Sequence, residues 1–203
     1  MKKKTILVAA IAVMLVAALV VGGTLAYFTD AKSANNTFTM GNVAITLDET
    51  DVKNPNERTT KGNTYNVYPG QTVTKDPIVH NTGRNAAYIR ATVTVSNWAT
   101  LSKELYPNVA LADTLKELVG SFGEGWSVVG AAADNSGAVT FTLKYDRQLA
   151  ASADTAPMFQ QVTVPAGLEN ENASSFKTMT VQAQAIQADG FTTWDDAFAA
   201  FDK

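Results

Sequence analysis

The 203-residue sequence contains no cysteine and only one histidine, His80. Without cysteine the chain can form no disulfide bonds and has no thiol nucleophile, so packing and hydrogen bonding must supply its stability. A zinc site needs three or four His, Cys or carboxylate ligands, and the sequence has no H-E-x-x-H pair. We therefore interpret His80, a lone histidine beside a turn, as structural.

Motifs of other common catalytic sites are also missing. The chain has no G-x-S-x-G elbow that could work with His80, and no Walker or dinucleotide-binding glycine pattern. Asp189, Asp195 and Asp196 cluster near the C-terminus, where helix capping and solubility explain them better than glycosidase chemistry. The loop carboxylates leave a weak calcium site open, although no EF-hand spacing supports one. We predict no catalytic residue, no cofactor and no enzymatic activity.

The chain has a single long apolar run, residues 6–21, preceded by three lysines and followed by a Gly-Gly pair. The small residues Thr24 and Ala26 suit the −3 and −1 positions of a signal-peptide cleavage site, and a cut after Ala26 would make Tyr27 the new N-terminus. The run is also nearly long enough to span a bilayer, so an uncleaved anchor is the alternative. We predict that residues 1–26 are a signal peptide and that the protein is secreted.

The charge balance limits the partners of the mature chain. The precursor has a net charge of −3, and loss of the three leader lysines would take this to −6. An acidic chain is a poor ligand for nucleic acids and for anionic membrane surfaces. No second apolar run of spanning length follows the leader. We therefore expect no nucleic-acid partner, and membrane contact only through the leader of the precursor.

Alternating apolar and polar residues, typical of half-buried strands, dominate the rest of the sequence. We predict a mainly β fold, a two-sheet antiparallel sandwich of the jelly-roll type, as one domain over residues 42–203. Residues 48–66 are polar and predicted to be an exposed loop, and residues 67–70 a tight turn. The predicted strands are residues 37–47, 72–80, 88–95, 126–130, 139–145, 158–164 and 176–188.

Two segments break the alternation and are predicted to be helical. Within residues 101–122 apolar side chains recur at helical spacing, and Asn108 is the predicted cap of this short insertion. At the C-terminus, Thr192 and Asp195 would cap a small amphipathic helix. Its aromatic stripe would pack against the sheet: Trp194, Phe198 and Phe201.

A polar, asparagine-rich segment, residues 27–41, separates the predicted leader from the predicted sandwich. It carries the apolar residues Phe28, Phe38 and Met40 and contains no proline. The edge of a sheet exposes unpaired backbone groups that a strand from a partner can pair with. One hypothesis is that this segment, once freed by cleavage, completes the sheet of another subunit. The alternatives are a disordered tail and a first strand that pairs within its own subunit.

Two stretches of the sequence resemble a known family. GGTLAYFTD, residues 22–30, is similar to the leader junction of proteins exported through the SipW-type signal peptidase. NTFTMGNV, residues 36–43, is similar to the N-terminal stretch of the TasA and camelysin family, and residues 69–83 resemble a second signature of that family. The resemblance covers residues 1–95.

The resemblance implies a Gram-positive biofilm-matrix or cell-surface protein built as a jelly roll. In fibres of this family the freed N-terminal strand completes the sheet of the next subunit, so the donor here would be Tyr27 to Met40, with Phe28 and Phe38 as anchors. Such head-to-tail assembly is open-ended, as a filament requires. The expected partner is another copy of the chain, with other matrix proteins as further candidates. Camelysin has also been classed with metallopeptidases, so a surface peptidase or a monomeric adhesin is the alternative.

Overall fold

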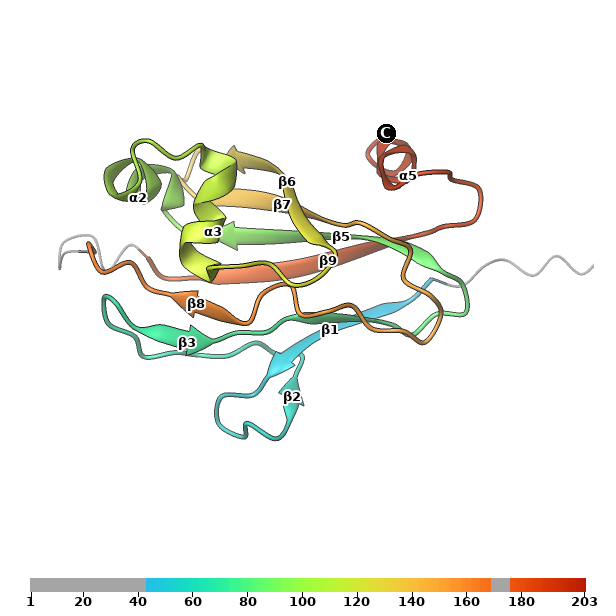
Figure 1. Cartoon of the computed structure of the whole chain (residues 1–203), viewed down its shortest axis with the longest axis horizontal. Coiled ribbons are helices and arrows are strands. Elements are labelled where there is room, and N and C mark those ends of the chain that lie inside the picture. Colours follow the sequence, from blue (N-terminus) through green and yellow to red (C-terminus); the bar gives the residue numbers. More distant parts are fainter. Residues whose placement is uncertain (1–42, 169–175) are drawn as a thin grey trace, which may run out of the picture. The chain divides into compact units, whose positions relative to one another are not determined.

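The computed structural model describes residues 43–168 and 176–203, which form a mainly β fold with three antiparallel sheets and three α-helices (Figure 1). The strands are β1 (Ile45–Thr50), β2 (Arg58–Thr59), β3 (Thr72–Thr74), β4 (Ile78–Asn81), β5 (Ala87–Val95), β6 (Trp126–Ala133), β7 (Val139–Tyr145), β8 (Gln161–Thr163) and β9 (Met179–Gln187). The helices are α2 (Trp98–Leu105), the 3₁₀ turn η1 (Leu111–Asp113), α3 (Thr114–Val119) and α5 (Trp194–Phe201).

The largest sheet has four strands in the order β6-β7-β5-β9. The central strand β5 pairs with β7 on one side and β9 on the other, so that Val93 lies opposite both Phe141 and Val181. The alternation in β5 is complete, because every second side chain is fully buried: Ile89, Ala91, Val93 and Val95. This confirms the strand predicted over residues 88–95.

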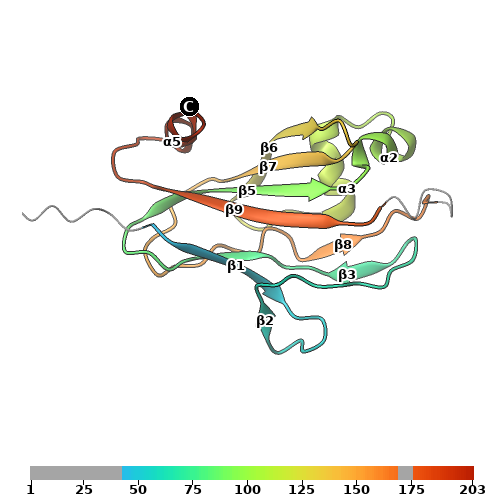
Figure 2. The ribbon, with the colours of Figure 1, turned by 180° about the vertical axis from the view of Figure 1, so that it is seen from behind.

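Two smaller sheets, β2-β1-β4 and β3-β8, lie on one side of the four-stranded sheet (Figures 1 and 2). Pro77 separates β3 from β4, as a residue without an N–H donor is expected to do, and its carbonyl accepts a hydrogen bond of 2.9 Å from the N–H of Met158. The predicted strand 158–164 is shorter than expected, because only Gln161–Thr163 pair as β8. Met158 and Phe159 precede it as buried core residues.

One hydrophobic core receives side chains from the four-stranded sheet and from the smaller sheets. Its fully buried members include Val79, Ile89, Val93, Phe141, Leu143, Met158 and Phe159. The mainly β prediction is confirmed at this level. The described strands divide into three sheets rather than the predicted two, and a jelly-roll connectivity is not established by this arrangement.

The prediction of a loop over residues 48–66 was wrong at the start of the segment and in its middle. Strand β1 continues through Asp48 and Glu49 to Thr50, and β2 pairs antiparallel with its end. Charged residues lower strand propensity, but here each carboxylate has a basic partner: Arg58 for Asp48 and Lys75 for Glu49. Those partners lie too far along the chain for a local pattern to reveal them.

The helical insertion begins earlier than predicted and is divided. Helix α2 begins at Trp98, after Asn97 with its left-handed φ of 53°, and Asn108 caps neither α2 nor α3. The Trp98 ring is fully buried, and its Nε1–H donates to Thr114 Oγ1 at 2.9 Å. This contact between the two helices fixes the shape of the insertion.

Helix α5 packs as predicted, with its cap one residue later. Thr193, rather than Thr192, accepts a hydrogen bond from the N–H of Asp196, at 3.1 Å. Trp194 donates from Nε1 to the carbonyl of Ile89 at 2.7 Å, and Phe198 is buried with it. The last aromatic residue of the stripe, Phe201, is 55% exposed, so two of the three aromatic residues anchor the helix.

Candidate functional site

The residues predicted from sequence to act in export and assembly lie outside the described residues. These are Thr24, Ala26 and Tyr27 at the cleavage site, and Phe28, Phe38 and Met40 in the assembly segment. Their roles remain predictions. What the structure does describe is the surface that could receive such a segment, namely the two edges of the four-stranded sheet.

The β6 edge is irregular. The register between β6 and β7 shifts between Val128 and Gly130, which marks a β-bulge at Val129, and η1 lies beside the strand. Bulges and covering segments are common ways in which proteins prevent unwanted strand pairing at an edge. Val129 is itself 51% exposed. The β6 edge is therefore poorly suited to receive another strand.

The β9 edge is regular. All nine residues from Met179 to Gln187 pair in continuous register with β5, and within residues 43–168 and 176–203 no strand pairs with the other side of β9. The carbonyl of Thr178 accepts from the N–H of Ser96, on the β5 side, at 3.1 Å. Because backbone groups alternate along a strand, those of Met179 and Val181 point away from β5. The free edge thus offers regularly spaced donors and acceptors.

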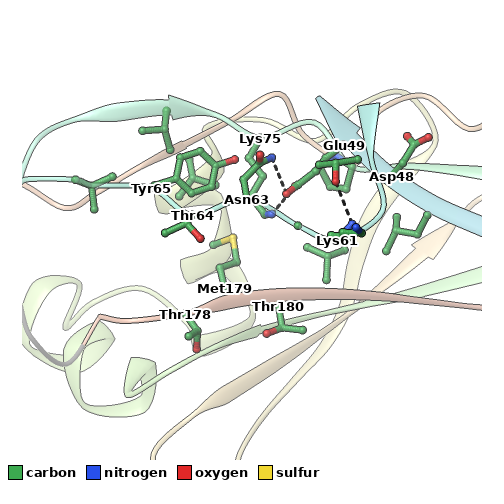
Figure 3. Close-up of a pocket in the computed structure, with 18 of the residues that line it drawn as sticks. Asp48, Glu49, Lys61, Asn63, Thr64, Tyr65, Lys75, Thr178, Met179 and Thr180 are labelled. Atoms are coloured by element: carbon green, nitrogen blue, oxygen red, sulfur yellow. Dashed lines mark hydrogen bonds and ion pairs between the residues drawn. The ribbon is translucent and has the colours of Figure 1, made fainter. Parts of the chain in front are cut away.

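A cavity of about 530 Å³ lies beside this edge, and we call it the β9 groove. Figure 3 shows Thr178, just before β9, and Met179 and Thr180 of β9 along one wall, with Glu49, Asn63 and Lys75 across from them. The far wall comes from β1, β3, β8 and residues 59–67. Its apolar lining includes Leu47, Val67, Val73, Phe176, Met179 and Val181. The groove therefore places apolar surface directly beside the outer edge of β9, with which no described strand pairs.

One part of the groove is polar. The Glu49 carboxylate, in a residue only 5% exposed, contacts Lys75 Nζ at 2.5 Å and accepts from Asn63 Nδ2 at 3.0 Å. Tyr65 donates its hydroxyl hydrogen to the carbonyl of Thr74 at 2.8 Å. Burial, together with the nearby charge of Glu49, raises the pKa of Tyr65 to about 12, so the phenol stays protonated at neutral pH.

A charged cluster joins β1, β2 and the start of β4. Arg58 lies 2.5 Å from Asp48 through Nε and 2.9 Å from Asp76 through Nη1. His80 lies between two carboxylates, with Nδ1 2.7 Å from Asp154 and Nε2 3.0 Å from Asp48. The Nε2 contact is an ion pair without hydrogen-bond alignment, since this buried atom has no aligned acceptor.

The contacts within the cluster favour the charged forms of its members, and their pKa values are shifted accordingly. Burial opposes ionisation of Asp48 and Asp76, but their hydrogen bonds, including those from Arg58, outweigh it and lower both pKa values below 3.8. Burial likewise favours a neutral His80, yet the carboxylates of Asp48 and Asp154 raise its pKa above 6.5. These contacts are in keeping with a structural role for His80.

Comparison with known families assigns the first 98 residues. The model of the family described as camelysin metallo-endopeptidase matches residues 1–98. Over these residues the chain is similar to proteins of the camelysin family. The match includes the predicted leader, strands β1–β5 and the first residue of α2, and it confirms the resemblance to the TasA and camelysin family. No curated protein and no solved structure gives a significant match.

Proteins of the camelysin and TasA family are generally exported or held at the cell surface. Within the described ranges, no helix combines the length and the apolar character needed to cross a bilayer.

The family description includes a metallopeptidase activity, which would require a bound metal ion. Both ring nitrogens of His80 face carboxylates, which leaves neither nitrogen free to ligate a metal. Among the residues that the structure describes, no three His, Cys, Asp or Glu side chains are grouped so that they could hold a metal ion. The described side chains therefore do not fit a catalytic zinc ion, and we derive no hydrolytic step through one.

Sequence reasoning missed both the groove and its polar part. The groove arises where residues distant in the chain, such as Val67 and Val181, come together. Glu49 did carry a signal: it follows Ile45 and Leu47 at two-residue spacing, so strand alternation places its carboxylate on the inward face. A charged residue at an inward position indicates a buried partner, which here is Lys75.

Proposed function

We propose that the chain is a secreted structural subunit that forms extracellular matrix fibres and has no enzymatic role. Residues 27–40 of one copy would add as a strand along the free edge of β9 in the next copy. The observation that carries this proposal is the regular β9 edge, which pairs with no other strand of the described residues and lies beside an apolar groove. The bulged β6 edge, at the other side of the same sheet, lacks this combination.

The chemistry of the donor segment matches that of the groove. Its backbone would pair with the outward N–H and C=O groups of β9, and it contains no proline to interrupt the ladder. Phe28, Phe38 and Met40 would enter the apolar part of the groove, and a fully buried side chain of this size contributes about 1.5–3 kcal/mol. A strand of nine residues spans about 30 Å, so a donor of this length is sufficient.

Repetition of this contact builds a filament. Donor and acceptor are different surfaces of the same chain, so the interface is head-to-tail and each added copy presents a new open edge. Pairing of the segment with its own subunit would instead close the edge and give a monomer. The two arrangements predict different assembly states for the same mature protein.

Deletion of the donor segment tests the proposal. Mature protein beginning at Tyr27 is expected to form filaments visible by electron microscopy, whereas a variant lacking residues 27–40 should remain monomeric by size-exclusion chromatography. When the two proteins are mixed, the deleted variant can accept a donor strand but cannot supply one. It should therefore not be able to extend a filament as a donor. Filaments formed by the deleted variant alone would contradict donor-strand addition.

A point substitution in the donor gives a sharper test. Phe38→Asp should impair assembly, because an ionised carboxylate would have to enter an apolar groove without a partner. Phe38→Leu is the matched control and should retain most of the polymer, since it keeps an apolar side chain. Polymer yield from Phe38→Asp equal to that of the wild type would remove Phe38 as an anchor.

A further inference from the structure

Three side chains in the polar part of the β9 groove form a set with reactive chemistry. Lys75 supplies a primary amine, Asn63 a carboxamide and Glu49 a carboxylate that contacts both. The amine lies 2.5 Å from Glu49 Oε2, and the amide nitrogen of Asn63 lies 3.0 Å from Glu49 Oε1. Figure 3 shows both nitrogen atoms directed at the one carboxylate.

The carboxamide of Asn63 is held by hydrogen bonds at both its oxygen and its nitrogen. Its Oδ1 accepts a hydrogen bond of 3.0 Å from the backbone N–H of Val52, which would stabilise negative charge developing on that oxygen. Its Nδ2 donates to Glu49 and, at 2.8 Å, to the carbonyl of Thr50. The oxygen thus faces a hydrogen-bond donor, and the nitrogen faces a group that can protonate it.

We propose that Lys75 and Asn63 form an intramolecular isopeptide bond, with Glu49 as the proton-transfer group. Glu49 takes a proton from the ammonium of Lys75, and the neutral amine attacks Cγ of Asn63. The Nζ–Cγ bond forms, Glu49 passes its proton to Nδ2 and takes a second proton from Nζ, and the Cγ–Nδ2 bond breaks, so that Glu49 ends protonated. One amide is exchanged for another and one ammonia molecule leaves, so the step requires no oxidant, reductant or co-reactant.

Burial favours this reaction over a permanent ion pair. The side chains of Glu49 and Lys75 are only 6% and 11% exposed, and a buried ion pair carries a desolvation cost that its attraction does not always offset. A single proton transfer across the 2.5 Å contact gives the two neutral groups that the reaction needs. The product replaces the buried ammonium by a neutral amide, which removes the charge that burial disfavours.

The bond would be a covalent cross-link in a chain that has no cysteine and so no disulfide bond. It would join the segment after β2 to the end of β3 and close the loop between residues 63 and 75. Closing such a loop restricts the unfolded chain in the way that a disulfide bond does. This inference is independent of donor-strand assembly, because the three side chains belong to one subunit.

Tryptic mapping of the secreted mature protein tests the proposal. An acylated lysine is not a trypsin site, so Lys75 should escape cleavage and residues 62–84 should appear as one peptide. Its mass should be lower than the sequence mass by one ammonia molecule. Wild-type protein, incubated at neutral pH, that retains the full sequence mass and is cleaved after Lys75 would overturn the proposal.

Variants separate the isopeptide bond from other reactions of asparagine. Lys75→Arg, which keeps the positive charge, and Glu49→Gln, which keeps a hydrogen-bonding group, should both lose the mass change. Asn66→Ala is the matched control, because Asn66 lies exposed in the same peptide, and it should keep the mass change. Ammonia loss that persists in Lys75→Arg would indicate a succinimide at Asn63 and would also overturn the proposal.

Discussion

The two edges of the four-stranded sheet, β6 and β9, differ in a way that bears on assembly. β6 carries a bulge at Val129 and lies next to η1, whereas β9 keeps an unbroken register with β5 over nine residues. A free and regular sheet edge is normally a liability, because it pairs with other chains. Within the described residues, the β6 edge is disrupted, whereas the β9 edge is regular and has no partner strand.

The surroundings of the two edges differ as well. Beside β9 lies a groove whose far wall, formed by the smaller sheets and the loop after β2, carries apolar side chains that include Val67. Beside β6 the exposed apolar side chain is Val129, which belongs to the bulge itself. An edge supplies only backbone hydrogen bonds, while a groove adds side-chain pockets that select a particular strand. This combination is the basis for proposing β9 as the acceptor.

Introducing a charge beside each edge in turn is expected to give the largest difference in polymer yield between two variants. Val67→Asp should lower polymer formation by about tenfold or more, because an ionised carboxylate in the groove would have to be desolvated by the incoming strand. Val67 is 40% exposed, so the fold itself should tolerate the change. Val129→Asp, at an exposed position on β6, is the control and should assemble normally. Equal polymer yields from Val67→Asp and Val129→Asp in sedimentation assays would contradict the proposed difference between the edges.

A substitution that lowers the stability of the fold, at a residue away from both edges, separates effects on stability from effects on assembly. Asn81 is 1% exposed, and its Nδ2 donates to the carbonyls of Asn85, Leu149 and Ala150. Asn81→Ala should lower the free energy of unfolding by about 2–4 kcal/mol, because three donated hydrogen bonds are lost and the buried N–H of Gly83 loses Oδ1 as its acceptor. Urea denaturation measures the change.

If the edges act as described, folded Asn81→Ala protein should still assemble. A substitution that changes the unfolding free energy by less than about 0.5 kcal/mol would show that Asn81 contributes little to the fold.

The charged cluster beside β1 should give a smaller, pH-dependent effect. The pKa of His80 is raised above 6.5 in the folded state, so its contribution is complete below pH 6.5 and is lost as the pH rises through the folded pKa. Asp48 and Asp76 have lowered pKa values, so their contribution is present above pH 3.8 and is lost as the pH falls through the folded pKa values.

The melting temperature should therefore decline on both sides of the range between these values. His80→Gln should flatten the alkaline decline and leave the acid decline in place, with an effect of about 1 kcal/mol or less for partly exposed pairs. Differential scanning calorimetry across pH values measures both declines. An alkaline decline unchanged in His80→Gln would show that another group causes it.

The sequence allowed the four-stranded sheet to be predicted because its strands follow a local rule. Alternation in β5 and β7 reports burial on one face, and the structure confirms it at Val93 and Phe141. The insertion was placed too late, because α2 begins at Trp98 through a contact with Thr114 that no local pattern reveals. The end of β1 was missed for the same reason, since its carboxylates depend on distant basic partners.

The candidate site was less predictable than the fold. The donor segment was inferred from its position after the leader and from the family resemblance, and it lies outside the described residues. The acceptor could not be inferred, because it depends on which strand ends up at an edge and which side chains from other strands line the adjoining groove. Those are properties of tertiary packing, and Val67 and Val181 share no sequence pattern that would link them.

Disulfide trapping tests the central claim most directly, and the absence of native cysteine makes each engineered pair unambiguous. Thr39→Cys protein would be mixed with Thr180→Cys protein under oxidising conditions, with Val129→Cys as the matched acceptor at the β6 edge. Neighbouring strands place opposite Cβ atoms about 4.5–5.5 Å apart, so Thr37→Cys serves as a second donor if the register differs by two residues. Donor-strand addition along β9 predicts a mixed disulfide with Cys at position 180 and little with Cys at position 129. Mixed disulfides that form at position 129 and not at position 180 would contradict it.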